Sequence, residues 1–397
     1  MPKSTRKVSW DVVRVVAVLS VAVGHITRQG PLSHPELGPI DVYIPVLFGA
    51  NTLLVVSAFF ICVTVRRGPT GRWLGHKLAK LLPAYFAALI ATYLVLNTVA
   101  GHFGWYEPTE RDLWANLLLI QNFSADFAYV DGSYWTMSAQ VLAFVAAALL
   151  VPRAWLRGRA LTVLLWSLIL VPIAVAQFNR ATPDALLSRV LFDGLTLHRA
   201  ALFGAGAVIY LWTKDRVSFR HLIGYCFATV AALEWHTEHT DTPSTIAFGV
   251  ALAMVVAAAG GPDWNIGPLA KPVTWLGGIS LGVYLVHQEL GYVLARVLVR
   301  LGVGQTGRVV LCLAMAVLLG WALTRTIEGP AYTWLTTGGP ARLWRTLGDL
   351  PTVPAQPQAS SSGGTPLSAD AGPRPASQAR TAAAGPPTSA PPVPDTT

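Results

Sequence analysis

Two ionisable side chains, Arg14 and His25, lie eleven positions apart in the first long apolar stretch of the chain, residues 8–26. An α-helix turns about 100° per residue, so both side chains fall within about 20° of one face, about 16 Å apart along the axis. Ionisable groups within membrane helices usually face a protein interior or a wet cavity, and they mark functional sites. The spacing therefore predicts a polar site on one helix face. A snorkelling Arg14 and an incidental His25 remain the alternative.

The composition predicts a protein that crosses a membrane many times. The chain has 397 residues, of which 53% are hydrophobic and only 12% are charged, whereas soluble domains carry about 25% charged residues. The net charge of +9 comes from basic residues in short connectors, so it does not indicate nucleic-acid binding. The three cysteines lie in apolar runs without a CxxC pair, so neither a disulfide framework nor a metal site is expected.

Ten apolar runs are long enough, or nearly so, to cross a bilayer as helices of about 20 residues. The sequence thus predicts an all-α, polytopic membrane protein of about ten transmembrane helices. The predicted spans cover residues 9–27, 43–65, 78–99, 133–152, 160–177, 198–213, 217–235, 243–260, 273–296 and 306–327.

Basic connectors at residues 66–80, 153–159 and 214–221 alternate with acidic ones such as 101–132. The positive-inside rule then places both termini in the cytoplasm, although connector 297–308 opposes this assignment. Abundant Arg, Ala and Gly favour a GC-rich bacterial source, and so a bacterial plasma membrane.

The last part of the chain differs in composition from the rest. Residues 351–397 are rich in Pro, Ala, Ser, Gly and Thr and contain no aromatic residue, so they predict a disordered cytoplasmic tail. We expect a transmembrane domain at residues 1–335 and a juxtamembrane segment at 336–350.

Several motifs, taken in order, resemble the acyltransferase-3 family of integral membrane O-acyltransferases. The Arg14–His25 spacing resembles its signature, and residues 56–61 (VSAFFI) resemble its Ser-Gly-Phe-like stretch. Residues 77–85 (KLAKLLPAY) resemble a basic-x-x-basic run before Leu-Pro-x-Tyr. Residues 278–287 (GISLGVYLVH) resemble its Gly-x-Ser…Tyr-Leu-x-His helix, and residues 327–330 (IEGP) resemble its closing Glu-x-Pro. The resemblance covers about residues 8–335.

The chain departs from the family pattern at two places. Lys77 and Lys80 stand where members commonly have arginines, which keeps the charge but loses the bidentate fork. Gln140 follows a Trp-Thr-Met-Ser-Ala stretch where members often carry a glutamate. Gln140 can bind His25 or the acceptor, but it cannot receive a proton as a carboxylate does.

The resemblance implies transfer of an acyl group from acyl-CoA to a hydroxyl. His25 is the expected catalytic residue, because a hydroxyl needs a base to become a good nucleophile. Whether it acts only as a base or also carries the acyl group stays open. The expected substrate-binding residues are Arg14, Lys77, Lys80, Gln140, Tyr284 and His287, and a structural role for His287 stays open as well.

The sequence thus predicts a membrane O-acyltransferase that moves an acetyl or other short acyl group to a sugar of a cell-surface glycan or a glycosylated metabolite. No tightly bound cofactor is expected, because acyl-CoA is a substrate. The expected partners are the donor, the acceptor, the lipid bilayer and a separate accessory protein.

A secondary transporter or exporter is the alternative, since transporters also hold buried ionisable groups. The absence of internal repeats and of paired broken helices argues against it. A structural membrane subunit is a third interpretation.

Overall fold

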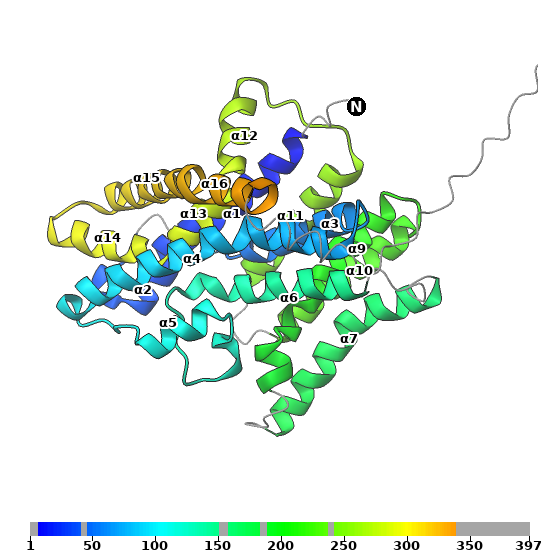
Figure 1. Ribbon diagram of the computed structural model, residues 1–397, viewed down its shortest axis with the longest axis horizontal. Helices are drawn as coiled ribbons and strands as arrows, with labels where there is room; N and C mark the ends of the chain where they lie inside the picture. Colours follow the sequence, from blue (N-terminus) through cyan, green and yellow to red (C-terminus); the bar gives the residue numbers. More distant parts are fainter. Residues whose placement is uncertain (1–6, 41–45, 151–157, 183–188, 237–241, 339–397) are drawn as a thin grey trace, which may run out of the picture. The chain divides into compact units, whose positions relative to one another are not determined.

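The computed structural model describes residues 7–40, 46–150, 158–182, 189–236 and 242–338, and these residues form helices and connectors without a strand. The all-helical prediction is confirmed (Figure 1). The predicted tail at 351–397 lies outside the described residues, as does most of the segment 336–350. The α-helices are α1 Val8–Gly24, α2 Gly30–Ser33, α3 Gly49–Thr64, α4 Thr70–Phe103, α5 Glu110–Leu117, α6 Trp135–Leu150, α7 Arg159–Ala181, α9 Ala200–Trp212, α10 Phe219–His236, α11 Thr242–Gly260, α12 Ala270–Gly278, α13 Ser280–Val286, α14 Glu289–Arg300, α15 Gln305–Leu323 and α16 Gly329–Thr333.

Six helical segments among the described residues are long and apolar enough to cross a membrane, or seven if one bent pair is counted as a span. Two further helical segments, α3 and Leu197–Trp212, are apolar but shorter than these six. Helices lie at all ten predicted runs, yet the count of ten spans stays a prediction. The six segments are Val8–Ser33, Thr70–Phe103, Gly132–Leu150, Arg159–Ala181, Thr242–Gly260 and Gln305–Thr337.

The ninth predicted run, residues 273–296, is not one continuous helix. The segment Gly267–Gly278 meets α13 at a bend of 55°, and α13 ends at Val286 before α14 begins at Glu289. The Asp131 carboxylate accepts the backbone N–H of Glu289 at 3.0 Å and so caps the new helix. Three short helices, α12, α13 and α14, replace the single span.

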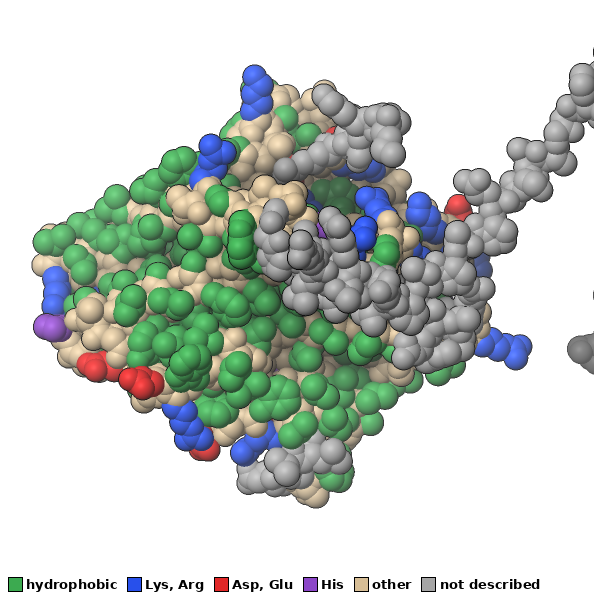
Figure 2. All heavy atoms as spheres, in the orientation of Figure 1, with side chains coloured by type: hydrophobic (Ala, Val, Ile, Leu, Met, Phe, Trp, Pro, Cys, Tyr) green, Lys and Arg blue, Asp and Glu red, His purple; other side chains and the backbone are tan. Residues whose placement is uncertain are grey.

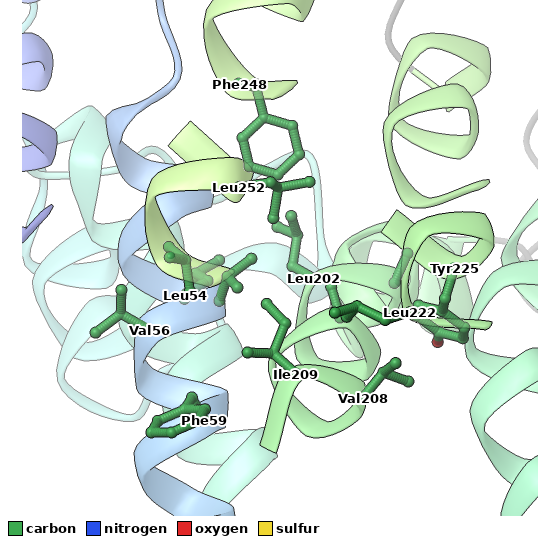
Figure 3. Close-up of a cluster of buried hydrophobic side chains, with 14 of the residues drawn as sticks. Leu54, Val56, Phe59, Leu202, Val208, Ile209, Leu222, Tyr225, Phe248 and Leu252 are labelled. Carbon is green, nitrogen blue, oxygen red and sulfur yellow. The ribbon is translucent and has the colours of Figure 1, made fainter. Parts of the chain in front are cut away.

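A close-packed core joins α3 and α9 with α10 and α11 (Figure 3). Leu54 of α3, Ile209 of α9 and Phe248 of α11 are all less than one-tenth exposed. The two central helices touch at Gly206, where an added Cβ would lie 2.4 Å from the carbonyl oxygen of Val55. Small residues at such contacts let helix backbones approach closely.

Large apolar side chains lie exposed along the helix flanks. Phe227 of α10 is 76% exposed and Val163 of α7 is 68% exposed. Hydrophobic side chains cover most of the face in Figure 2, and charged ones lie mainly toward its margins. Since soluble proteins rarely expose such large apolar areas, these flanks are the lipid-facing surface of a multi-pass membrane protein.

Candidate functional site

A cavity of about 1050 Å³ lies among α1, α3, α4, α6 and the α12–α13 bend. Its described lining holds one acidic side chain, Glu328, against six basic ones. Clefts lined by one sign of charge concentrate ligands of the opposite sign, so the cavity favours an anion. The basic lining residues are Lys7, Arg14, Arg67, Lys77, Lys80 and Lys214.

Arg14 reaches this cavity from the middle of α1. Its Nη1 lies 3.2 Å from Oδ1 of Asp11, one helical turn earlier, whose side chain is fully buried. The guanidinium also lies over the Phe60 ring, 4.8 Å from the ring centroid. Asp11 and Phe60 thus orient Arg14 while a quarter of its side chain stays exposed.

Lys77 and Lys80 enter the cavity from one face of α4. The Lys77 ammonium lies between two rings, 5.7 Å from the centroid of Trp73 and 5.8 Å from that of Phe144. Lys80 Nζ is 4.0 Å from Glu328 Oε1, and its side chain remains 64% exposed. Exposed pairs at this separation add little stability, so Lys80 can exchange Glu328 for another anion.

Gln140 and Tyr284 line the same cavity from α6 and α13. Gln140 is 8% exposed, and its Nε2 has no hydrogen-bond partner among the described residues. The Tyr284 hydroxyl donates to the Ser133 carbonyl at 3.2 Å and accepts from Thr136 Oγ1 at 3.1 Å. Tyr284 is therefore held firmly, whereas Gln140 offers a buried N–H donor.

His25 and His287 form a pair outside the residues that line the cavity. His25 begins a π-helical turn, His25–Gln29, directly after α1, and such turns often occur at functional sites. Its Nδ1 lies 3.0 Å from Nε2 of His287, and the rings stack with centroids 4.9 Å apart. His287 Nδ1 lies 2.6 Å from the backbone oxygen of Tyr284, so Tyr284 contacts both the cavity and the histidine pair.

The first turn of α1 is fixed by the connector that follows α11. Asp263 accepts the backbone N–H groups of Ser9 at 2.8 Å and Val8 at 3.0 Å. These hydrogen bonds, chiefly the one from Ser9, hold the pKa of Asp263 below its ordinary value. Lys7 Nζ donates to the Gly261 oxygen at 2.9 Å. The start of α1, which carries Arg14, is thereby anchored.

Of the predicted site residues, Arg14, Lys77, Lys80, Gln140 and Tyr284 share the cavity, and His25 and His287 contact each other. Lys7, Arg67 and Lys214 were missed because a basic residue in a connector has the same pattern whether it faces the cytoplasm or a cavity.

Arg199, an arginine at the edge of the predicted run 198–213, was not singled out from the sequence either. Its guanidinium lies over the Trp135 ring at 4.7 Å, and its Nη1 is 3.5 Å from Asn51 Oδ1. Within the part of the chain that the structure describes, its buried Nε has no hydrogen-bond partner.

Comparison with known proteins gives one clear result. Searches against curated proteins and against solved structures found no match. The profile of an acyltransferase domain matches residues 7–325, a range that contains every lining residue of the cavity except Glu328, together with both histidines. The chain therefore belongs to the acyltransferase-3 family, and it is a membrane acyltransferase.

Proposed function

We propose that the protein transfers an acetyl or other short acyl group from acyl-CoA to a hydroxyl of a sugar, on a cell-surface glycan or a glycosylated metabolite. The single observation that carries this proposal is the cation-lined cavity beside the His25–His287 pair. Tyr284 lines the cavity and its backbone oxygen lies 2.6 Å from His287 Nδ1, so the cavity adjoins the pair.

The cavity suits the donor in its charge and in its apolar lining. Coenzyme A carries a diphosphate and a further phosphate at its nucleotide end, and six basic side chains surround the cavity. Arg14 can bind phosphate oxygens through a planar fork, while Lys77 and Lys80 act as point charges. The aromatic side chains of Trp10 and Tyr210 add apolar lining for the remainder of the donor.

His25 is the proposed base. It takes the proton of the acceptor hydroxyl as the hydroxyl oxygen attacks the thioester carbonyl. The carbon–sulfur bond then breaks, and the proton passes to the departing CoA thiolate. The products are the ester and free CoA thiol, so atoms and charge balance. A positioned base of this kind contributes about 10²- to 10⁴-fold to the rate.

On the proposed orientation both termini face the cytoplasm of a bacterial cell, and so does the basic mouth of the cavity, by which we mean the part lined by its six basic side chains. Connectors rich in arginine and lysine support this side, and cytoplasmic acyl-CoA would enter there. A separate accessory protein is the proposed partner for delivery or use of the acceptor.

A secondary transporter is the second candidate. The bend between α12 and α13, which borders the cavity at Gly278 and Ser280, favours it, because transporters build binding sites from broken helices. The described residues hold one such bent pair, not broken helices paired across two repeats, so the sequence argument against a transporter is not overturned. Release of CoA thiol separates the two functions, since transport releases none.

The test is thiol release by the purified protein with acetyl-CoA and mixed sugar acceptors. We expect release by the wild type and a loss of at least about 100-fold in His25→Ala. Lys77→Gln should raise the donor KM about 10-fold or more with little change in kcat, because it removes a charge-assisted contact to the ground state.

Two controls sharpen the result. Lys271→Gln removes a lysine of α12 that does not line the cavity, and it should leave the donor KM unchanged. Acetyl-dephospho-CoA lacks one phosphate, so wild type should bind it more weakly and Lys77→Gln should discriminate less. Equal release by wild type and His25→Ala would overturn the proposed role of His25, and substrate flux without thiol release would favour the transporter.

A further inference from the structure

We infer that His287 is a positioning residue that holds His25 as the tautomer with its proton on Nδ1, so that Nε2 of His25 is left as the unprotonated base. This inference rests on the proposed acyl transfer for its kinetic meaning, and on the hydrogen-bond geometry alone for its structural content. It gives His287 a different role from the substrate contact that the motif suggested.

The backbone oxygen of Tyr284 fixes the position of the proton on His287. A carbonyl oxygen can only accept, so the ring nitrogen 2.6 Å away, His287 Nδ1, must carry the proton. Helix α13 ends at Val286, and the last carbonyls of a helix lack backbone partners. The break after α13 therefore leaves this carbonyl to the imidazole.

The surroundings of His287 favour its neutral form. Its side chain is 1% exposed, and its two described hydrogen bonds go to a carbonyl and to another imidazole. Neither partner offsets a positive charge, and burying an uncompensated charge is costly. A neutral His287 with its proton on Nδ1 has a lone pair on Nε2.

The proton position on His287 in turn determines which nitrogen of His25 is protonated. Since Nε2 of His287 can only accept, His25 Nδ1 at 3.0 Å must be the donor. A neutral His25 then carries its lone pair on Nε2, the ring atom that points away from its partner. Free imidazole side chains favour the opposite tautomer, with the proton on Nε2, so the protein selects the form that exposes a base.

The carbonyl that sets this chain is itself held in place. The Tyr284 hydroxyl donates to the Ser133 oxygen, and the Tyr134 hydroxyl donates to the Leu285 oxygen at 3.0 Å. Asp131 accepts the N–H of Glu289 on the far side of His287. The segment 131–134 thus clamps the chain before and after His287, as a supporting group of a catalytic base requires.

Two variants of nearly equal size separate positioning from packing. In His287→Gln the side-chain oxygen lies near the former Nε2 and can accept from His25. In His287→Asn the amide can donate to Tyr284 but is too short to reach His25. We expect Gln to keep kcat within about 10-fold of wild type and Asn to lower kcat by about 100-fold or more, both with unchanged donor KM.

The tautomer itself can be read without any activity. In protein labelled with ¹⁵N-histidine in detergent, protonated and unprotonated ring nitrogens resonate far apart, and His25→Gln identifies the His25 signals by their loss. We expect wild-type His25 to have a protonated Nδ1 and an unprotonated Nε2, and His287→Asn to reverse this preference.

A protonated Nε2 on wild-type His25 would overturn the inference even if acyl transfer is found. The expected tautomer in a protein that releases no thiol with any donor would leave the geometry correct and would count against the proposed function. Equal losses in His287→Gln and His287→Asn, with the wild-type tautomer in both, would also overturn the positioning role.

Discussion

At the residue scale, Arg14 has two separable tasks. It offsets the charge of the fully buried Asp11, and it lines the cavity that is the proposed donor site. Removing one partner of a buried ion pair costs about 3–5 kcal/mol, because the other charge is left in a dry environment. A simple loss of activity in an Arg14 variant would therefore not distinguish donor binding from folding.

A double variant resolves the two tasks. We expect Arg14→Met to lower the thermal unfolding temperature and to raise the donor KM. Arg14→Met combined with Asp11→Asn should regain most of the unfolding temperature, because position 11 then carries no charge for Arg14 to offset, while the donor KM stays high. Thermal unfolding in detergent and thiol-release kinetics measure the two effects. Recovery of both properties together would assign Arg14 a purely structural role.

The sequence predicted these residues to different degrees. The Arg14–His25 spacing predicts a shared face because helix periodicity is local. However, α1 ends at Gly24 and His25 begins a π-helical turn, and Arg14 lines the cavity whereas His25 does not. The contact between His25 and His287 joins residues 262 positions apart, so no local pattern could predict it. Gln140 was a possible partner of His25, but the structure places it in the cavity lining.

At the element scale, the placement of His287 depends on how closely α13 packs on α15. An added Cβ on Gly320 would lie 2.4 Å from the backbone nitrogen of Val283, and one on Gly282 would lie 2.3 Å from the Gly320 oxygen. Neither contact can relax by turning a side chain, because both neighbours are backbone atoms. The two helices must therefore separate if either glycine gains a methyl group.

We accordingly expect Gly320→Ala to lower kcat by displacing α13 and the Tyr284 carbonyl, and to reduce stability by about 1–3 kcal/mol as overpacking does. Gly224→Ala in α10 is the matched control, since an added Cβ there meets no atom within 4 Å. It should be neutral or gain about 0.5–1 kcal/mol from helix propensity. Thiol-release kinetics and unfolding curves of both variants test this, and a fully active, stable Gly320→Ala would contradict the packing argument.

Hydropathy predicted where helices lie but not where they break. Averaging over a span does not register single backbone hydrogen bonds, such as the one from Glu289 N–H to Asp131 that separates α13 from α14. The break carries the histidine that contacts His25, so the element that the sequence described least well is the one that builds the site.

At the scale of the whole molecule, the proposed function requires the basic cavity mouth to face the cytoplasm. The two ends of helix α4 lie far apart, because its 34 residues extend about 50 Å. Arg67 lies just before it and lines the cavity, while Tyr106 lies just after it and is 60% exposed. The two positions therefore report opposite ends of one element.

We expect a membrane-impermeant thiol reagent to label Arg67→Cys only in inverted vesicles and Tyr106→Cys only in right-side-out vesicles, in a background with the three native cysteines replaced. Acyl-CoA should slow labelling of Arg67→Cys, because the donor fills the cavity beside it, and should leave labelling of Tyr106→Cys unchanged. The reverse sidedness would place the cavity mouth outside the cell. Cytoplasmic acyl-CoA could not then enter there, and the cations of the cavity would have to bind an external anion instead.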